Sequence, residues 1–114
     1  MSERFTYHVL YRRRDQTTAV GLLAEGRADP ALPNRVVGWD HQDEDWTEAQ
    51  ASLGAILINP DYEDRIRIVD RSTAERIARE SLGAELPSEE ELQAIGDRAA
   101  EMYARKWGPK GTSS

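Results

Sequence analysis

Apolar and polar residues alternate with a period of two in the first part of the chain. Aromatic and branched side chains recur from Phe5 to Tyr11, which predicts a β-strand because neighbouring side chains of a strand face opposite sides. A polar turn separates this segment from an apolar run over residues 18–24, and together they predict a β-hairpin. Residues 25–34 carry one glycine and two prolines and predict a loop, and residues 35–40 predict a short third strand.

The period changes to that of a helix after the third strand. Apolar residues now recur with the spacing of one helix face, at Trp46, Ala49, Leu53, Ile56 and Leu57. Asp45 with Glu48 fits a capping pair, so the helix is expected to begin there. Thr47 with Gln50 fits a second such pair two residues later. Pro60 disfavours helical geometry at the residue before it and is expected to end the helix.

A fourth strand and two further helices are expected to complete the chain. Isoleucines alternate with charged residues over 65–70, which predicts the strand. Each helix is preceded by a capping box, formed by Ser72 with Glu75 and by Ser88 with Glu91. Gly83 fits the left-handed position that follows a helix, and the last helix is expected to end near Trp107.

The order β-β-β-α-β-α-α predicts an α+β fold. We expect a small, mostly antiparallel sheet of three to four strands, with three helices packed on one of its faces. A chain of 114 residues indicates a single domain, which we place over residues 1–107, with 108–114 as a flexible tail. A chain of this size buries roughly two-thirds of its unfolded surface, so it needs no metal or disulfide to fold.

Several classes of chemistry are excluded by composition and by missing motifs. The chain has no cysteine, which excludes disulfides, thiolate metal sites and thiol catalysis. It contains no glycine-rich phosphate loop and no nucleophile elbow. No apolar run approaches the length of a membrane span, and the charged N-terminus lacks the apolar core of a signal peptide. We therefore expect a cytoplasmic protein that crosses no membrane and uses no cofactor.

Negative charge is concentrated in the middle of the chain. The formal net charge is −6, yet the segment from Val36 to Asp64 contains eight carboxylates and no lysine or arginine. The rest of the chain is therefore slightly positive. The densest part of this segment is the sequence WDHQDEDW at 39–46.

One interpretation of this octapeptide is a metal or acid–base site. The side chains of Asp40, His41, Asp43, Glu44 and Asp45 are ligands that Mg²⁺, Ca²⁺ or Mn²⁺ accept. Their spacing matches a calcium-binding loop at only two positions, however. His41 beside Asp43 fits an acid–base pair, but so do any two carboxylates. A small metal-dependent or acid–base enzyme built on His41 is thus an alternative. His8 is expected to be a partly exposed residue of the first strand.

A second interpretation is a docking surface for a basic protein. Carboxylates speed the encounter with a basic partner, and tryptophans supply apolar contact area. The predicted binding residues are Trp39, Asp40, His41, Asp43, Glu44, Asp45 and Trp46. We favour this function, which suits an inhibitor, immunity or adaptor protein that is not an enzyme. The competing structural interpretation is that both tryptophans are buried and the carboxylates form a solvated loop and a helix cap.

Two other parts of the chain have features of an interaction surface. Arg12, Arg13 and Arg14 lie at the predicted hairpin turn and could grip phosphates, but the run is short and the net charge opposes binding to nucleic acid, so nucleic acid is an unlikely partner. The last helix is as long as the domain is wide, so its final turns can project. Met102, Tyr103 and Trp107 are the predicted contacts of a homodimer formed there.

Overall fold

The computed structural model describes residues 5–26 and 35–107, without the side chains of Tyr103 and Trp107. The strands are β1 (Phe5–Tyr11), β2 (Ala19–Gly26), β3 (Arg35–Asp40), β4 (Asp45–Glu48) and β5 (Ile66–Val69). The helices are α1 (Gln50–Ile58), η1 (Pro60–Tyr62), α2 (Arg71–Ile77), η2 (Ala78–Leu82) and α3 (Glu89–Trp107). Among these helices none has both the length and the apolar content that crossing a membrane requires. The predicted tail at 108–114 and most of the predicted loop lie outside the described residues.

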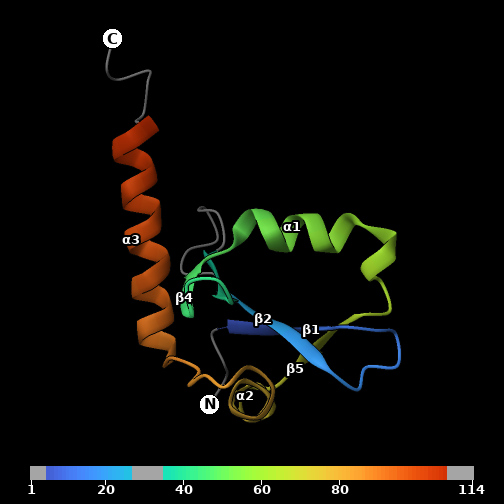
Figure 1. Ribbon diagram of the computed structural model, residues 1–114. Helices are drawn as coiled ribbons and strands as arrows, with labels where there is room; N and C mark the ends of the chain where they lie inside the picture. The colour runs from blue at the N-terminus through green and yellow to red at the C-terminus, as the bar shows by residue number, and fades with distance from the viewer. Residues whose placement is uncertain (1–4, 27–34, 108–114) are drawn as a thin grey trace.

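The strands form one antiparallel sheet in the order β4-β3-β2-β1-β5 (Figure 1). The first four strands follow one another as a meander, and β5 returns to pair with β1 on the other side. This confirms the α+β class and the antiparallel sheet. The sheet has five strands instead of three to four, and the element order is β-β-β-β-α-β-α-α.

The helices cover both faces of the sheet, so the prediction that they share one face is wrong. Leu22 and Leu23 are neighbours in β2 and therefore point to opposite sides. Leu22 belongs to the cluster that contains Ala74 of α2, whereas Leu23 belongs to the cluster that contains Leu53 of α1. Figure 1 shows α1 on one side of the sheet and α2 on the other. The apolar run in β2 is continuous because both of its faces are buried.

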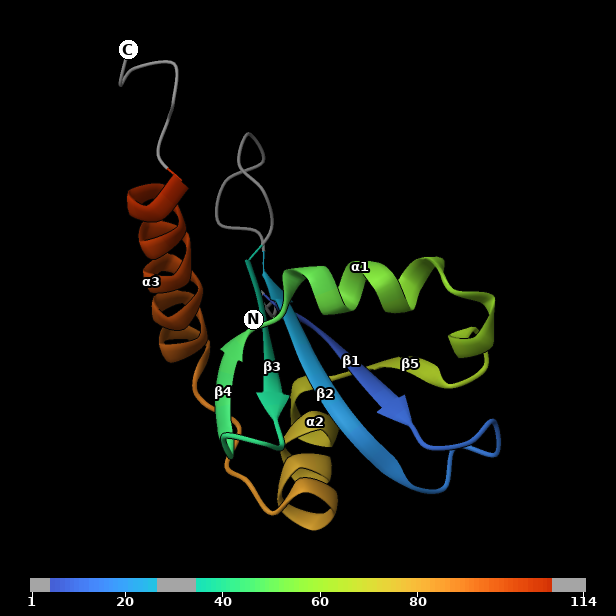
Figure 2. The ribbon, with the colours of Figure 1, turned by 45° about the horizontal axis from the view of Figure 1, so that its top comes forward.

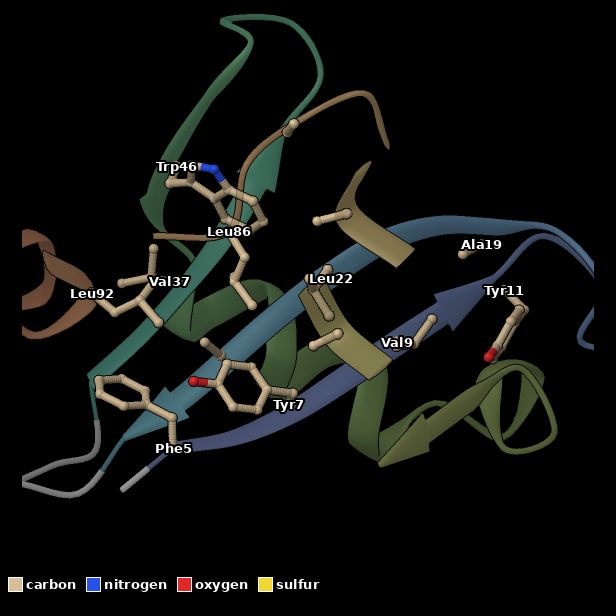
Figure 3. Close-up of a cluster of buried hydrophobic side chains, with 14 residues drawn as sticks. Phe5, Tyr7, Val9, Tyr11, Ala19, Leu22, Val37, Trp46, Leu86 and Leu92 are labelled. Carbon is tan, nitrogen blue, oxygen red and sulfur yellow. The ribbon is translucent and has the colours of Figure 1, made fainter. Parts of the chain in front are cut away.

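The larger cluster lies between the sheet and the segment from α2 to the start of α3 (Figure 3). Tyr7, Val9, Leu22, Val37 and Leu92 are its most deeply buried large side chains. The smaller cluster joins α1 to the opposite face through Leu23, Val36 and Leu53. The last described turns of α3 extend beyond the sheet. The main core is therefore on the α2 side.

The helix predicted to begin at Asp45 begins instead at Gln50, and its capping pairs are wrong. Residues Asp45–Glu48 form β4, and the residue before the helix, Ala49, provides no side-chain cap. Leu57 belongs to the predicted buried face but is more than half exposed. Hydrogen bonds to β3 and burial of Trp46 outweigh the helical spacing in this segment.

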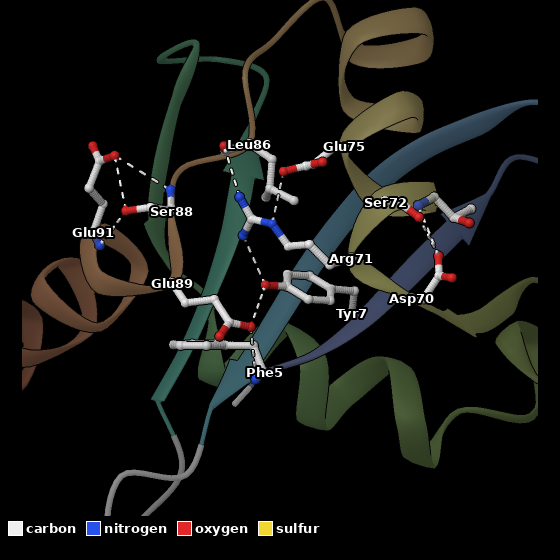
Figure 4. Close-up of polar contacts among 11 residues, drawn as sticks. Phe5, Tyr7, Asp70, Arg71, Ser72, Glu75, Leu86, Ser88, Glu89 and Glu91 are labelled. Atoms are coloured by element: carbon white, nitrogen blue, oxygen red, sulfur yellow. Dashed lines mark hydrogen bonds and ion pairs between the residues drawn. The ribbon is translucent and has the colours of Figure 1, made fainter. Parts of the chain in front are cut away.

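The boundaries near the C-terminus are closer to expectation. Asp70, not Ser72, caps α2, because its carboxylate accepts the backbone N–H of Thr73 at 2.9 Å. Hydrogen bonds from the side chain and the backbone of Thr73 lower the pKa of Asp70. Gly83 has the predicted left-handed conformation, with a φ of 65°. The expected box before α3 is confirmed by the hydrogen bonds between Ser88 and Glu91 (Figure 4).

Two glycines are expected to respond in opposite ways to substitution by alanine. A Cβ at Gly26 would lie 2.4 Å from the buried ring of Phe5, so Gly26→Ala should lower the free energy of unfolding by about 1–3 kcal/mol. Gly54 lies within α1 with no atom near its added Cβ, so Gly54→Ala should raise it by about 0.5–1 kcal/mol. Urea unfolding followed by tryptophan fluorescence measures both. A shift in the same direction for both variants would contradict the packing described.

Candidate functional site

Residues 39–46 form the end of a β-hairpin, called here the acidic hairpin (Figure 2). Its ladder pairs Trp39 with Trp46 and Asp40 with Asp45, and residues 41–44 make the turn between β3 and β4. The two indole rings lie on one face, with their centroids 5.3 Å apart. All the predicted binding residues are thus brought together, on a rigid turn rather than at a helix start.

The two tryptophans have different roles in the structure. Trp46 is buried in the main core, and its indole nitrogen donates a hydrogen bond of 3.0 Å to the backbone oxygen of Glu85 (Figure 3). Trp39 is half-buried against that ring and meets the ring of His41 edge-on at 6.4 Å. Only Trp39 therefore has surface to offer a partner, while Trp46 holds the hairpin against the domain.

The carboxylates of the hairpin fall into two groups. Asp40 is half-buried, and its Oδ1 accepts the backbone N–H groups of Gln42 and Asp43 at 2.9 and 3.3 Å, which fixes the turn. Asp43 and Glu44 are exposed at the tip. Within residues 5–26 and 35–107, no lysine or arginine forms an ion pair with any carboxylate of the hairpin.

Two features of the turn are unfavourable for the hairpin itself. Asp40 and Asp45 are direct cross-strand partners, and like charges in that position destabilise a sheet. Glu44 has a φ of 51°, a left-handed conformation that L-residues other than asparagine and aspartate adopt rarely. The tryptophan pair and the anchoring of Trp46 offset these costs. Negative charge is therefore held in a fixed and locally unfavourable arrangement.

His41 is engaged with the neighbouring strand. Its Nε2 lies 2.6 Å from the backbone oxygen of Val20 in β2, so this nitrogen carries the hydrogen and donates it. The contact ties the tip of the acidic hairpin to the start of β2. Across the described part of the chain, no three histidine or carboxylate side chains converge as a metal site requires. The geometry gives the metal interpretation no support.

A polar network joins β1 to the C-terminal helices (Figure 4). The spacing of residues in the sequence gave no sign of it. The Tyr7 hydroxyl donates to Glu89 of α3 and accepts from Nη1 of Arg71 in α2, each at 2.9 Å. Nε of Arg71 also donates to Glu75 at 3.1 Å. Burial of Tyr7, more than any of its partners, raises the pKa of its hydroxyl to about 12. Every group has a partner within the domain, so the network is a structural tie.

His8 is buried, which corrects the expectation that it is partly exposed. It lies on the sheet face opposite Tyr7, and its Nε2 is 3.1 Å from a carboxylate oxygen of Glu25 in β2. A sheet covered on one face only would have left this histidine in solvent. Because α1 packs on that face, His8 is enclosed instead.

Of the predicted dimer contacts, the structure describes the side chain of Met102. It is 67 % exposed on a part of α3 that extends away from the sheet (Figure 1). The side chains of Tyr103 and Trp107 lie outside the described residues. Self-association through this helix stays a prediction, and so does the cytoplasmic location.

No protein-family model matches the chain, and no curated protein or solved structure matches it either.

Proposed function

We propose that this protein is a binding module, not an enzyme, and that the acidic hairpin docks a basic surface of another protein. Asp43 and Glu44 form the centre of the contact. Asp40 and Asp45 flank them on one face of the hairpin, and the exposed edge of Trp39 flanks them on the other. This function suits an inhibitor, an immunity protein or an adaptor.

The observation that carries the proposal is the uncompensated charge of the turn. The like-charged pair of Asp40 and Asp45 and the left-handed Glu44 both cost local stability, and they occur within six residues. Breaks in local folding rules tend to cluster where a protein meets a partner. A lysine-rich or arginine-rich surface of a partner would supply the positive charges with which these carboxylates form no ion pair among the described residues.

The rigidity of the hairpin supports the same function. The turn is fixed by hydrogen bonds from Gln42 and Asp43 to Asp40 and by the bond from His41 to Val20. A surface that is already ordered loses little conformational entropy when a partner binds. Carboxylates held together in this way also raise the rate of encounter with a positive surface over distances of about a Debye length.

A charge-reversal pair tests the proposal. The variant Asp43→Lys/Glu44→Lys is compared with Asp61→Lys/Glu63→Lys, whose two residues are exposed carboxylates of the same acidic segment outside the hairpin. Both variants change the net charge of the protein from −6 to about −2. They therefore differ only in where on the surface the new positive charges lie. Proteins captured by the wild type from its host extract are identified, and the association rate of the purified partner is measured in low salt.

We expect the hairpin variant to slow association by about 10-fold to 100-fold at low salt, with a much smaller effect in the control. The difference should shrink as salt rises, because screening removes it. Unchanged affinity of the hairpin variant for the partner at low salt would contradict the proposal. An equal loss of affinity in both variants would contradict it as well. Circular dichroism verifies that both variants are folded.

A further inference from the structure

The turn between β1 and β2 borders a small, open surface cavity at the arginine run. The cavity has a volume of about 140 Å³ and is lined by Arg12, Arg13, Asp15, Thr17 and Thr18. This space is more than sufficient for a single phosphate group.

The turn that forms this cavity has a defined shape. The backbone N–H of Arg12 donates to the carbonyl of Thr18 at 2.8 Å, which closes the loop at its base. Oδ1 of Asp15 accepts both the backbone N–H and the hydroxyl of Thr17, at 3.1 and 2.9 Å. Gln16 has a φ of 57°, and its side-chain nitrogen donates to the carbonyl of Asp64 at 3.2 Å. The arginines are thus carried on a frame that internal hydrogen bonds hold.

The positive charges of the turn, on the guanidinium groups of Arg12, Arg13 and Arg14, form no ion pair in the part of the chain that the structure describes. The carboxylate of Asp15 also lines the cavity, and it accepts hydrogen bonds from Thr17. A fourth cation lies at the same end of the sheet, because Nε of Arg65 donates to the carbonyl of Tyr11 at 3.1 Å. With three arginines and one aspartate, residues 12–18 carry a net charge of +2, which favours the binding of an anion.

We infer that this cavity binds the phosphate group of a small phosphorylated molecule. The guanidinium groups of Arg12 and Arg13 supply the charge and paired N–H donors, a geometry that matches phosphate oxygens. The hydroxyl of Thr18 supplies a further donor from the cavity wall. The hydroxyl of Thr17 already donates its hydrogen to Asp15 and helps to hold the shape of the turn.

The surroundings favour a small ligand over a nucleic acid. The cavity has room for one phosphate, whereas a nucleic-acid strand needs a row of contacts along its backbone. In an antiparallel meander the turns 12–18 and 41–44 lie at the same end of the sheet, and the bond from His41 to Val20 draws the second turn toward β2. The acidic hairpin would therefore repel a polyanion that extended past the cavity.

Titration of the full chain with inorganic phosphate and with glycerol phosphate tests the inference. Binding is followed by calorimetry and by the NMR shifts of the Thr17 and Thr18 amides. We expect saturable binding of both, with Arg12→Ala and Arg13→Ala each weakening it about tenfold or more, since each removes charge-assisted hydrogen bonds. Arg14→Ala is the matched control, because it removes the same charge from the same turn without lining the cavity.

Three outcomes would overturn the inference. The first is the absence of saturable shifts with either phosphate, and the second is binding of inorganic phosphate without the ester. The third is an equal weakening by Arg14→Ala, which would indicate a diffuse positive field instead of a site. The same titration is made with a single-stranded oligonucleotide. If the oligonucleotide binds more tightly than the small phosphates, with a salt dependence that corresponds to several phosphates, the turn is assigned to nucleic acid. These substitutions are at exposed positions outside the acidic hairpin, so failure here leaves the docking proposal intact.

Discussion

Trp46→Ala should lower the free energy of unfolding by about 3–5 kcal/mol, which is a large share of the stability of a domain this size. The indole of Trp46 is buried among the main core residues, so its removal leaves a cavity. It also leaves the carbonyl of Glu85 without its donor. Trp39→Ala is expected to cost less, because the ring of Trp39 is only half-buried.

Urea unfolding followed by circular dichroism measures both tryptophan variants and avoids the change in fluorescence that each causes. Trp46→Phe is a useful third variant, because it keeps an aromatic ring and removes only the N–H donor and part of the volume. An equal cost for Trp39→Ala and Trp46→Ala would contradict the different burial of the two rings. If the costs differ as expected, binding studies of the acidic hairpin can use Trp39 variants, whose domain stays folded.

The second large effect concerns alkaline pH. The pKa of Tyr7 is raised from 10.0 to about 12 in the folded protein, so the unfolded chain loses this proton first as the pH rises. The contribution of the neutral hydroxyl is complete below pH 10 and is lost on the way to pH 12. A pKa difference of this size corresponds to a loss on the order of 3 kcal/mol.

Comparison of the wild type with Tyr7→Phe isolates that contribution from the other tyrosines. At neutral pH the variant should be less stable by about 1–3 kcal/mol, because Arg71 and Glu89 each lose a hydrogen-bond partner. The two stabilities should converge between pH 10 and about 12, because only the wild type loses the Tyr7 contribution. Urea titrations at several pH values measure this. A constant difference across the range would show that Tyr7 does not titrate as described.

Most of the regular elements could be predicted because their signals are local. β1, β2, β3 and β5 follow apolar patterns, and the box of Ser88 with Glu91 marks the start of α3. β4 was missed because Trp46 fits two periods at once, that of the following helix and that of a strand paired with β3. The near-symmetry of the octapeptide, with Trp39 and Asp40 mirrored by Asp45 and Trp46 around four polar residues, was the signal for a hairpin.

The residues of the acidic hairpin could be named from the sequence because they are contiguous. Their exposure could not be predicted from the sequence. Trp46 is buried against a segment 39 residues away in the chain, where its indole N–H donates to the backbone oxygen of Glu85. The same holds for His8, which is buried on the face that α1 covers, a face that was expected to be open. The network of Tyr7 with Arg71 and Glu89 joins residues far apart in the chain, and no spacing rule detects such contacts.

The tie from Tyr7 to Glu89 also bears on the order of events during synthesis. It connects positions 82 residues apart, and Leu92 of the same helix completes the core around β1. Contacts so distant in sequence form late and slow the folding of a domain. The apolar side chains of the first three strands that face α2 stay uncovered until α2 and α3 have been made, whereas those on the other face are covered earlier by α1. We therefore expect the newly made chain to expose the larger apolar cluster until α3 is complete, and a chain that ends before α3 to lack Leu92 and the tie to Glu89.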